Sequence, residues 1–305
     1  MLVAEIADGS TADFAAGTTD AGAYVARTGS GEVMLAPTEA AEFTGDELPA
    51  GWTVTPYHEG GSGFLGDGRI TLDGARVGCD TVFRGPPRAV DFSATFAARP
   101  DQHAGFGIDY TEVPWVMFST KWGRRLYART HLIGIEDKKL AGAWLGGAHH
   151  FRIEWNVLDI NFLVDGERAA YLLVPVPGYM RAVAANQRLG GPPLQVEWMR
   201  VSPYATAGTF RSRVLDAGGA VDWLDATWQA DVPAAATLRL SVRTGDGARP
   251  DRTWSPWRRL AAAGAPVDAT SRYLQYRARM TTSDERATPV LRRVAFRHRP
   301  ALPAP

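Results

Sequence analysis

Alternation of apolar and polar residues with a period of two constrains this chain more than any other feature. Apolar runs with helical spacing are almost missing, and Gly, Pro and Asp recur between the short alternating segments. Such alternation places every second side chain on one face of an extended strand. Val164-Asp-Gly-Glu167 and Leu72-Asp-Gly-Ala75 carry the Asp-Gly signal of a hairpin turn. The sequence therefore predicts an all-β chain of sandwich or jelly-roll type.

Composition narrows the possible partners. The 305 residues include one cysteine, Cys79, which excludes intrachain disulfides and cysteine-based zinc clusters. Lys+Arg and Asp+Glu both number 33, and this zero net charge argues against a nucleic-acid partner. No apolar stretch is long enough to cross a bilayer, so we expect no membrane insertion. The first residues also lack the basic start and apolar segment of a signal peptide.

The strand pattern restarts once along the chain, near residue 206. Before this point, short strands follow one another from about residue 51, and after it a second series runs from 209 to 298. We therefore expect two β-sandwich domains, a larger one over 1–205 and a smaller one over 206–300. Residues 301–305, rich in Ala and Pro, are expected to form a tail.

Three consecutive strands of the first domain, 103–110, 115–120 and 125–131, suggest a ligand site. Alternation puts two glycines on the same open face as several aromatic and polar side chains. If the strands are neighbours, they form a trough with a glycine floor, where rings stack on a sugar and polar groups bind its hydroxyls. The alternative is that the rings only cover the sheet, or that the two faces are reversed. The ligand-binding residues predicted here are His103, Asp109, Trp115, Tyr127 and Arg129, with Trp122 and Arg124 at the rim.

Three stretches of the first domain resemble the late strands of concanavalin A-like jelly rolls of the laminin-G, lectin and glucanase type. They are Gly105-Phe-Gly107, His150-Phe-Arg-Ile-Glu-Trp155 and Ile160-Asn-Phe-Leu-Val-Asp-Gly166. The resemblance covers about residues 40–204 and implies the fold rather than one function, because this fold hosts lectins, adhesion modules, hydrolases and lyases. It also makes a structural Ca²⁺ ion an option, held by loop carboxylates such as Asp67, Asp73 or Asp80.

The second domain resembles a β-sandwich module that is repeated in bacterial extracellular multidomain proteins. This resemblance implies export, so we expect a secreted or cell-surface protein as part of a longer chain, and a cytoplasmic location stays open. One strand, 272–281, would expose Tyr273, Gln275, Arg277 and Arg279, which together with Trp254 and Trp257 could bind a partner or a glycan. The stretches that carry the resemblance are 208–218, 242–246, 254–257, 272–277 and 288–291.

The sequence contains no clear motif of catalytic residues. Glucanases of this fold carry an E-x-D-x-x-E strand motif, and nothing in the chain matches it. The nearest carboxylate pair, Asp109 and Glu112, is separated from the next strand by Pro114 and is most simply a pair of solvated turn residues. We therefore predict no catalytic residue, and the sequence does not identify metal ligands.

Three functions are compatible with these features. The leading prediction is a non-catalytic carbohydrate-binding or adhesion module that takes a glycan or polysaccharide. The alternative is a polysaccharide-cleaving enzyme, hydrolase or lyase; in a lyase, His103, Tyr127 and Arg129 could serve as base, acid and carboxylate neutraliser. The third is a structural spacer.

Overall fold

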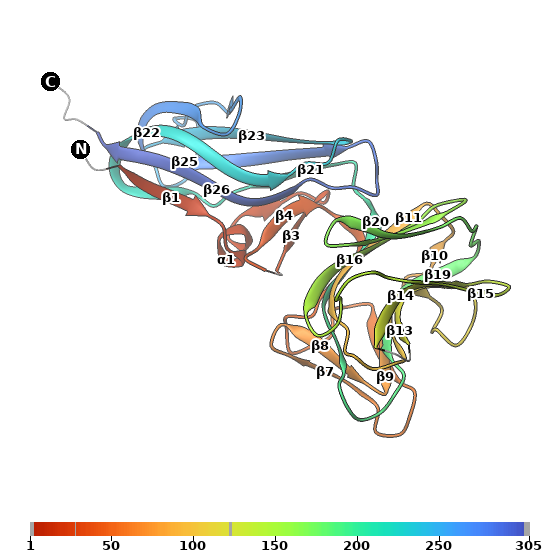
Figure 1. Ribbon diagram of the computed structural model, residues 1–305. Helices are drawn as coiled ribbons and strands as arrows, with labels where there is room; N and C mark the ends of the chain where they lie inside the picture. Colours follow the sequence, from red (N-terminus) through yellow and green to blue (C-terminus); the bar gives the residue numbers. More distant parts are fainter. Residues whose placement is uncertain (1–2, 28, 122–123, 302–305) are drawn as a thin grey trace. The chain divides into compact units, whose positions relative to one another are not determined.

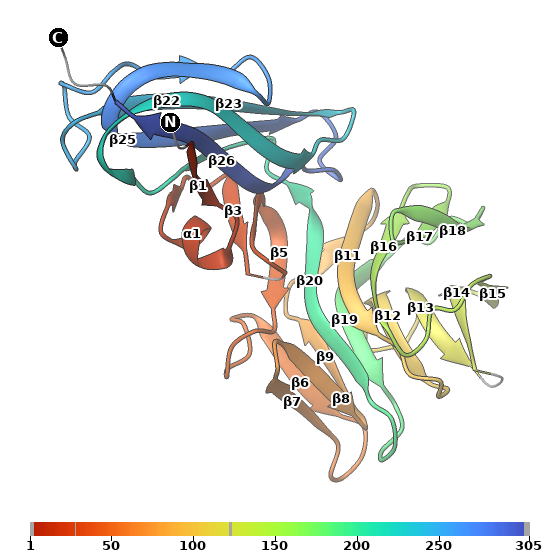
Figure 2. The ribbon, with the colours of Figure 1, turned by 60° about the vertical axis from the view of Figure 1, so that its left-hand side comes forward.

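A computed structural model describes residues 3–27, 29–121 and 124–301 (Figures 1 and 2). Almost all regular structure in these residues is strand, which confirms the all-β prediction. The chain forms two compact units: unit 2 is Pro37–Pro203, and unit 1 combines Met1–Ala36 with Tyr204–Pro305. No helix in the part of the chain that the structure describes has the length and apolar character that a membrane crossing requires.

Unit 2 contains two antiparallel sheets. Sheet I has the strand order β15-β14-β13-β12-β19-β9-β6, and β10 pairs with β19. Sheet II has the order β18-β17-β16-β11-β20-β8-β7, and β5 pairs with β20. Sheet I consists of β6 (Trp52–Pro56), β9 (Ala75–Cys79), β10 (Phe83–Arg84), β12 (Gln102–Gly107), β13 (Trp115–Lys121), β14 (Arg125–His131), β15 (Ile135–Lys139) and β19 (Tyr179–Asn186). Sheet II consists of β5 (Pro37–Glu42), β7 (Ser62–Gly66), β8 (Arg69–Asp73), β11 (Arg88–Thr95), β16 (Ala148–Trp155), β17 (Ile160–Val164), β18 (Glu167–Leu172) and β20 (Leu194–Tyr204).

Aromatic rings from the two sheets interlock to form the core of unit 2. The ring of Phe118 on β13 lies 4.9 Å from that of Phe151 and 5.2 Å from that of Phe162, both on sheet II. Trp155 is fully buried, and its Nε1 donates a hydrogen bond to the Val176 carbonyl at 2.7 Å. Burying these large apolar surfaces is the main favourable contribution to the stability of such a sandwich.

One ion pair in unit 2 is nearly shielded from water. Arg200 on β20 and Glu42 on β5 are joined at 2.8 Å between Nη2 and Oε1, and their side chains are 4% and 8% exposed. The guanidinium also lies 4.0 Å from the ring centroid of Trp198. The pair therefore fixes the position of β5 on sheet II.

Unit 1 is built on a ten-stranded sheet, here sheet III. Its elements are β1 (Ala4–Asp8), the helix α1 (Thr11–Ala15), β2 (Thr18–Thr19), β3 (Ala23–Ala26), β4 (Glu32–Leu35), β21 (Ala207–Arg211), β22 (Leu215–Asp231), β23 (Ala236–Gly245), β24 (Arg258–Arg259), β25 (Ala265–Thr282) and β26 (Val290–Pro300). Fully buried Trp223, Tyr276 and Phe296 belong to its core.

The first 36 residues differ from their predicted place in the domain over 1–205. Strand β1 pairs with β26, with Ala4 opposite His298, and β4 also pairs with β26. Strand β2 pairs with β21. These hydrogen-bonded ladders attach the amino-terminal segment to unit 1, so the jelly-roll unit starts at Pro37.

Candidate functional site

Three strands of sheet I bring the predicted trough residues onto one face. Strands β12, β13 and β14 are neighbours, with His103 opposite Ser119 and Ser119 opposite Tyr127. Gly105 lies opposite Met117, and Met117 lies opposite Arg129. The alternate residues of these strands belong to the core between the sheets, so the two faces are not reversed. The side chains predicted to bind a ligand thus share the outer face of sheet I.

Tyr110, however, fills the middle of this face. A Cβ atom added to Gly107 would lie 2.8 Å from the Tyr110 ring, so the glycine makes room for that ring. The Tyr110 hydroxyl donates a hydrogen bond to the Val183 carbonyl at 2.5 Å. Trp115 and Met117 pack against it and are 5% and 2% exposed. The space above Gly107 is therefore occupied by a ring of the same chain instead of a ligand.

His103 is buried beside this ring. It is 4% exposed, its ring lies 5.7 Å from that of Tyr110, and its Nδ1 lies 2.7 Å from Ser119 Oγ. Burial, together with the positive charge of Arg129, lowers the pKa of His103 to about 4. A buried neutral imidazole cannot reach a polysaccharide, so the suggested lyase base does not fit this position.

The other trough residues are bound within the protein. Arg129 Nε donates a hydrogen bond to Asp137 Oδ1 at 2.5 Å, and its guanidinium lies 5.3 Å from the Trp115 ring centroid. Tyr127 is half-buried beneath the Lys121 ammonium. Of the two rim residues, Arg124 is exposed at φ 54° just before β14, whereas Trp122 lies outside the described residues. An open stacking surface between Trp115 and Tyr127 is therefore not present.

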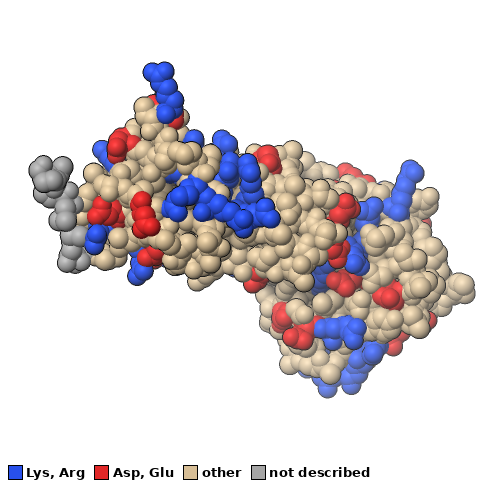
Figure 3. Space-filling view, turned by 90° about the horizontal axis from the view of Figure 1, so that it is seen from above, with Lys and Arg blue, Asp and Glu red and all other residues tan. Residues whose placement is uncertain are grey.

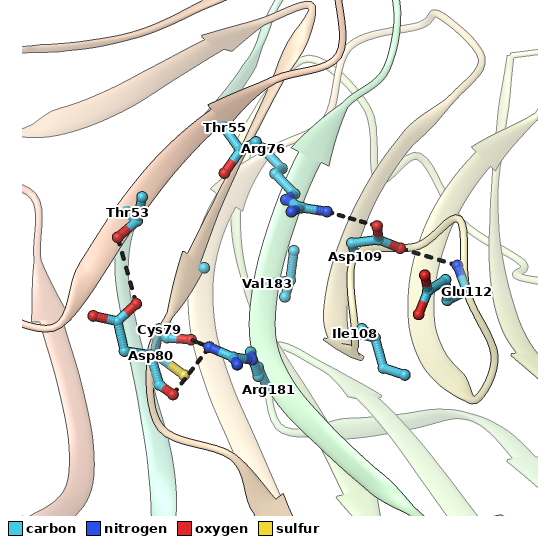
Figure 4. A pocket seen from close by; sticks show the side chains of 11 residues that line it. Thr53, Thr55, Arg76, Cys79, Asp80, Ile108, Asp109, Glu112, Arg181 and Val183 are labelled. Atoms are coloured by element: carbon cyan, nitrogen blue, oxygen red, sulfur yellow. Dashed lines mark hydrogen bonds and ion pairs between the residues drawn. The ribbon is translucent and has the colours of Figure 1, made fainter.

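A polar pocket of about 310 Å³ opens beside Tyr110 on the same unit, here called the Arg76 pocket. Figure 4 shows its side chains, which come from β6, β9, β19 and the segment after β12. Its lining residues are Thr53, Thr55, Arg76, Gly78, Cys79, Asp80, Ile108, Asp109, Glu112, Arg181 and Val183.

Asp109 is the fixed anion of this pocket. Its Oδ2 lies 2.9 Å from Nη1 of Arg76. Its Oδ1 accepts hydrogen bonds from the backbone and hydroxyl of Thr111, at 2.8 and 2.6 Å, and from the backbone of Glu112 at 2.9 Å. Burial opposes ionisation, but these hydrogen bonds outweigh it and lower the pKa of Asp109 to about 2. Asp109 is therefore negatively charged at any ordinary pH.

Two of the other charged groups of the pocket, Arg181 and Glu112, have no ion pair within the described ranges; the side chain of Asp80 likewise has only a hydrogen bond from Thr53. Arg181 Nη1 donates hydrogen bonds to the carbonyls of Cys79 and Asp80, at 3.3 and 3.0 Å (Figure 4). Glu112 is exposed and only its backbone amide is bound, to Asp109. Both side chains can therefore still pair with a ligand. Cys79 cannot react, because burial raises the pKa of its thiol to about 12.

Comparisons with known proteins find solved structures that are similar to this chain, but no match in sequence. No protein-family model matches the chain, and no curated protein matches its sequence. A glycosyl hydrolase family protein from Mycobacterium fortuitum is 14% identical over 55% of this chain and 100% of that chain, with a TM-score of 0.41. An endo-β-1,3-glucanase from Pyrococcus furiosus is 15% identical over 60% of this chain and 98% of that chain, with a TM-score of 0.41. A β-1,3-glucanase from Mycobacterium marinum is 12% identical over 54% of this chain and 98% of that chain, also with a TM-score of 0.41.

Unit 2 is a concanavalin A-like jelly roll. Its two facing antiparallel sheets with one aromatic core carry this assignment. The laminin-G part of the sequence resemblance and the extracellular module of the second domain stay predictions.

The prediction of a non-catalytic carbohydrate-binding or adhesion module was wrong. The structure buries Trp115 and His103, on which the binding prediction depended.

No three His, Cys, Asp or Glu side chains gather to hold a metal ion in the part of the chain that is described. The calcium option therefore stays a prediction.

The sequence did not predict the roles of Tyr110, Arg76 and Arg181. Alternation along β9 does predict that Arg76 and the buried Val77 point to opposite faces of the sheet. Only the long-range pairing of β9 with β19 brings Arg76 and Arg181 into one pocket.

Proposed function

We propose that the chain is a polysaccharide-cleaving enzyme whose reaction takes place in the Arg76 pocket. The observation that carries this proposal is the contrast between two of the three carboxylates of the pocket, Asp109 and Glu112. Asp109 is locked as an anion by Arg76 and three hydrogen bonds, whereas Glu112 is exposed and has no ion pair in the described residues. Two carboxylates with different environments are suited to different roles in cleaving a sugar chain.

Glu112 is the group of this pair that moves a proton. In hydrolysis it would protonate the oxygen of the bond that breaks, and it would be protonated again by the water that attacks the sugar carbon. In elimination from a uronic acid it would take the proton next to the carboxylate, which Arg181 would neutralise; as the carbon–carbon double bond forms and the carbon–oxygen bond breaks, it would return this proton to the leaving oxygen. Asp109 keeps its charge and orients Arg76 in both routes. The hydroxyls of Thr53 and Thr55, on β6, lie in the same pocket to bind sugar hydroxyls.

Replacing Glu112 with glutamine is expected to lower the rate of polysaccharide cleavage by about 100-fold or more, the usual contribution of a general acid or base. The wild type and Glu112→Gln are incubated with neutral and acidic polysaccharides. New reducing ends report any cleavage, and absorbance of an unsaturated uronate reports elimination.

Glu167→Gln is the matched control, because Glu167 is an exposed glutamate at the start of β18. It should cleave like the wild type. The proposal is wrong if the wild type releases no product from any polysaccharide of the panel, or if Glu112→Gln cleaves as fast as Glu167→Gln.

A further inference from the structure

Six arginines gather on one face of sheet III in unit 1. Residues directly opposite each other in neighbouring strands point to the same face. Arg211 of β21 is opposite Arg277 of β25, and Arg239 of β23 is opposite Arg279 of β25. Ser241 joins Arg277 on one side to Arg259 of β24 on the other. The six residues of this arginine face are Arg211, Arg239, Arg243, Arg259, Arg277 and Arg279; Figure 3 shows Lys and Arg side chains gathered on the side of unit 1 where β22 and β23 lie in Figure 1.

The positive charges of this face act on one another. Burial and the neighbouring charges of Arg279, Arg211 and Arg243 lower the pKa of Arg277. Burial and the charge of Arg211 lower the pKa of Arg243. Like charges directly opposite in a sheet are unfavourable. The free protein therefore tolerates a repulsion that an anionic ligand would relieve.

Several arginines elsewhere in unit 1 are balanced by acids. Arg272 pairs with Asp216, Arg293 with Glu5, and Arg297 with Asp225. None of the six arginines of the arginine face has such an ion pair within residues 3–27, 29–121 and 124–301. The acids that offset these other arginines therefore have no counterpart beside the arginine face among the described residues.

A tryptophan holds two of these guanidinium groups in place. The Trp257 ring centroid lies 4.7 Å from the guanidinium carbon of Arg243 and 4.5 Å from that of Arg277. Arg243 also donates two hydrogen bonds to Gln275 Oε1, at 3.0 and 2.6 Å. The Nε atom of Arg277 is buried without an acceptor among the described residues. Guanidinium groups that are held in place in this way can bind a carboxylate through two parallel hydrogen bonds.

We propose that the arginine face binds a polysaccharide of uronic acids. Its arginines start from backbone positions about 4.8 Å apart across strands and about 7 Å apart along them, so the face presents an array of cations to a chain that carries a carboxylate on each sugar. A face of several strands is too broad for the major groove of a DNA duplex, which would leave only contacts with phosphates. Single-stranded nucleic acids stack their bases on exposed aromatic rings, whereas the Trp257 ring is already in contact with the guanidinium groups of Arg243 and Arg277. The inference rests on unit 1 alone and does not depend on the Arg76 pocket.

Binding of polygalacturonate to the full chain tests this inference. Calorimetric titration at low salt should show binding to the wild type, and the affinity should fall as salt increases. The double variant Arg211→Gln/Arg279→Gln removes two exposed charges that have no ring contact, and it should weaken binding at least ten-fold. Its melting temperature should be unchanged or higher, because repulsion is removed.

Arg293→Gln/Arg297→Gln is the matched control, since it removes two paired arginines of the same unit. It should bind within two-fold of the wild type. The inference is overturned if the wild type does not bind polygalacturonate, if the control loses as much affinity as the test variant, or if DNA or polyglutamate binds as tightly.

Discussion

Replacing Tyr110 with alanine is expected to lower the free energy of unfolding by about 3–5 kcal/mol, the range for truncating a large buried ring. Tyr110 is 6% exposed and covers the glycine of β12 that would otherwise face solvent. Once the ring is removed, water reaches His103, and the pKa of His103 should rise from about 4 toward its ordinary value of 6.5. Chemical denaturation measures the first effect, and an NMR titration of the imidazole measures the second.

The dependence of stability on pH provides an independent measurement of the same contact. Because His103 has a lower pKa in the folded than in the unfolded chain, the unfolded chain binds more protons between pH 6.5 and 4. Stability of the wild type should therefore fall as the pH is lowered through this window, and the fall should be smaller in Tyr110→Ala. Tyr110→Phe keeps the ring and should keep the low pKa. A pKa near 4 for His103 in Tyr110→Ala would contradict the role given to the ring.

Replacing Arg200 with methionine is expected to cost about 3–5 kcal/mol of stability, because it leaves the Glu42 carboxylate buried without its cation. The change keeps a long apolar stem, so loss of volume contributes little. The double variant Arg200→Met/Glu42→Met removes both charges and should recover most of the loss. Urea denaturation of the three proteins measures these differences.

Arg188→Met is the control for this prediction. Arg188 pairs with Asp101 at 2.7 Å, but the two side chains are 41% and 36% exposed. Its loss should cost about 1 kcal/mol or less, as for other surface ion pairs. Equal losses for Arg188→Met and Arg200→Met would show that burial does not determine the strength of the pair at Arg200.

Local pattern predicted the strands and their faces well, because each depends on neighbours two residues apart. The alternation over 103–110 sorted Phe106 into the core and Gly107 onto the outer face, as the structure has them. The alternation of apolar and polar residues could not show which strands the first 36 residues pair with. Strand β1 pairs with β26 almost 300 residues later, and a short strand carries no local mark of such a partner.

The candidate site was harder to predict for a related reason. The two glycines did indicate a close neighbour, and the choice between a ligand and the chain itself depended on where Tyr110 turns. Tyr110 has φ 68°, in the left-handed region that a non-glycine residue seldom adopts, so its ring folds back over Gly107. Strict alternation along 103–110 would instead place Tyr110 in the core with Phe106. The Arg76 pocket also depends on pairing between strands that are distant in sequence.

The order of the segments along the chain has a consequence for biosynthesis. Unit 2 is one uninterrupted segment, whereas the sheet of unit 1 is completed only when β26 pairs with β1 and β4. During translation, the jelly roll can fold before the later strands of unit 1 are made. The amino-terminal strands must wait, unpaired with β26, until Val290–Pro300 has left the ribosome.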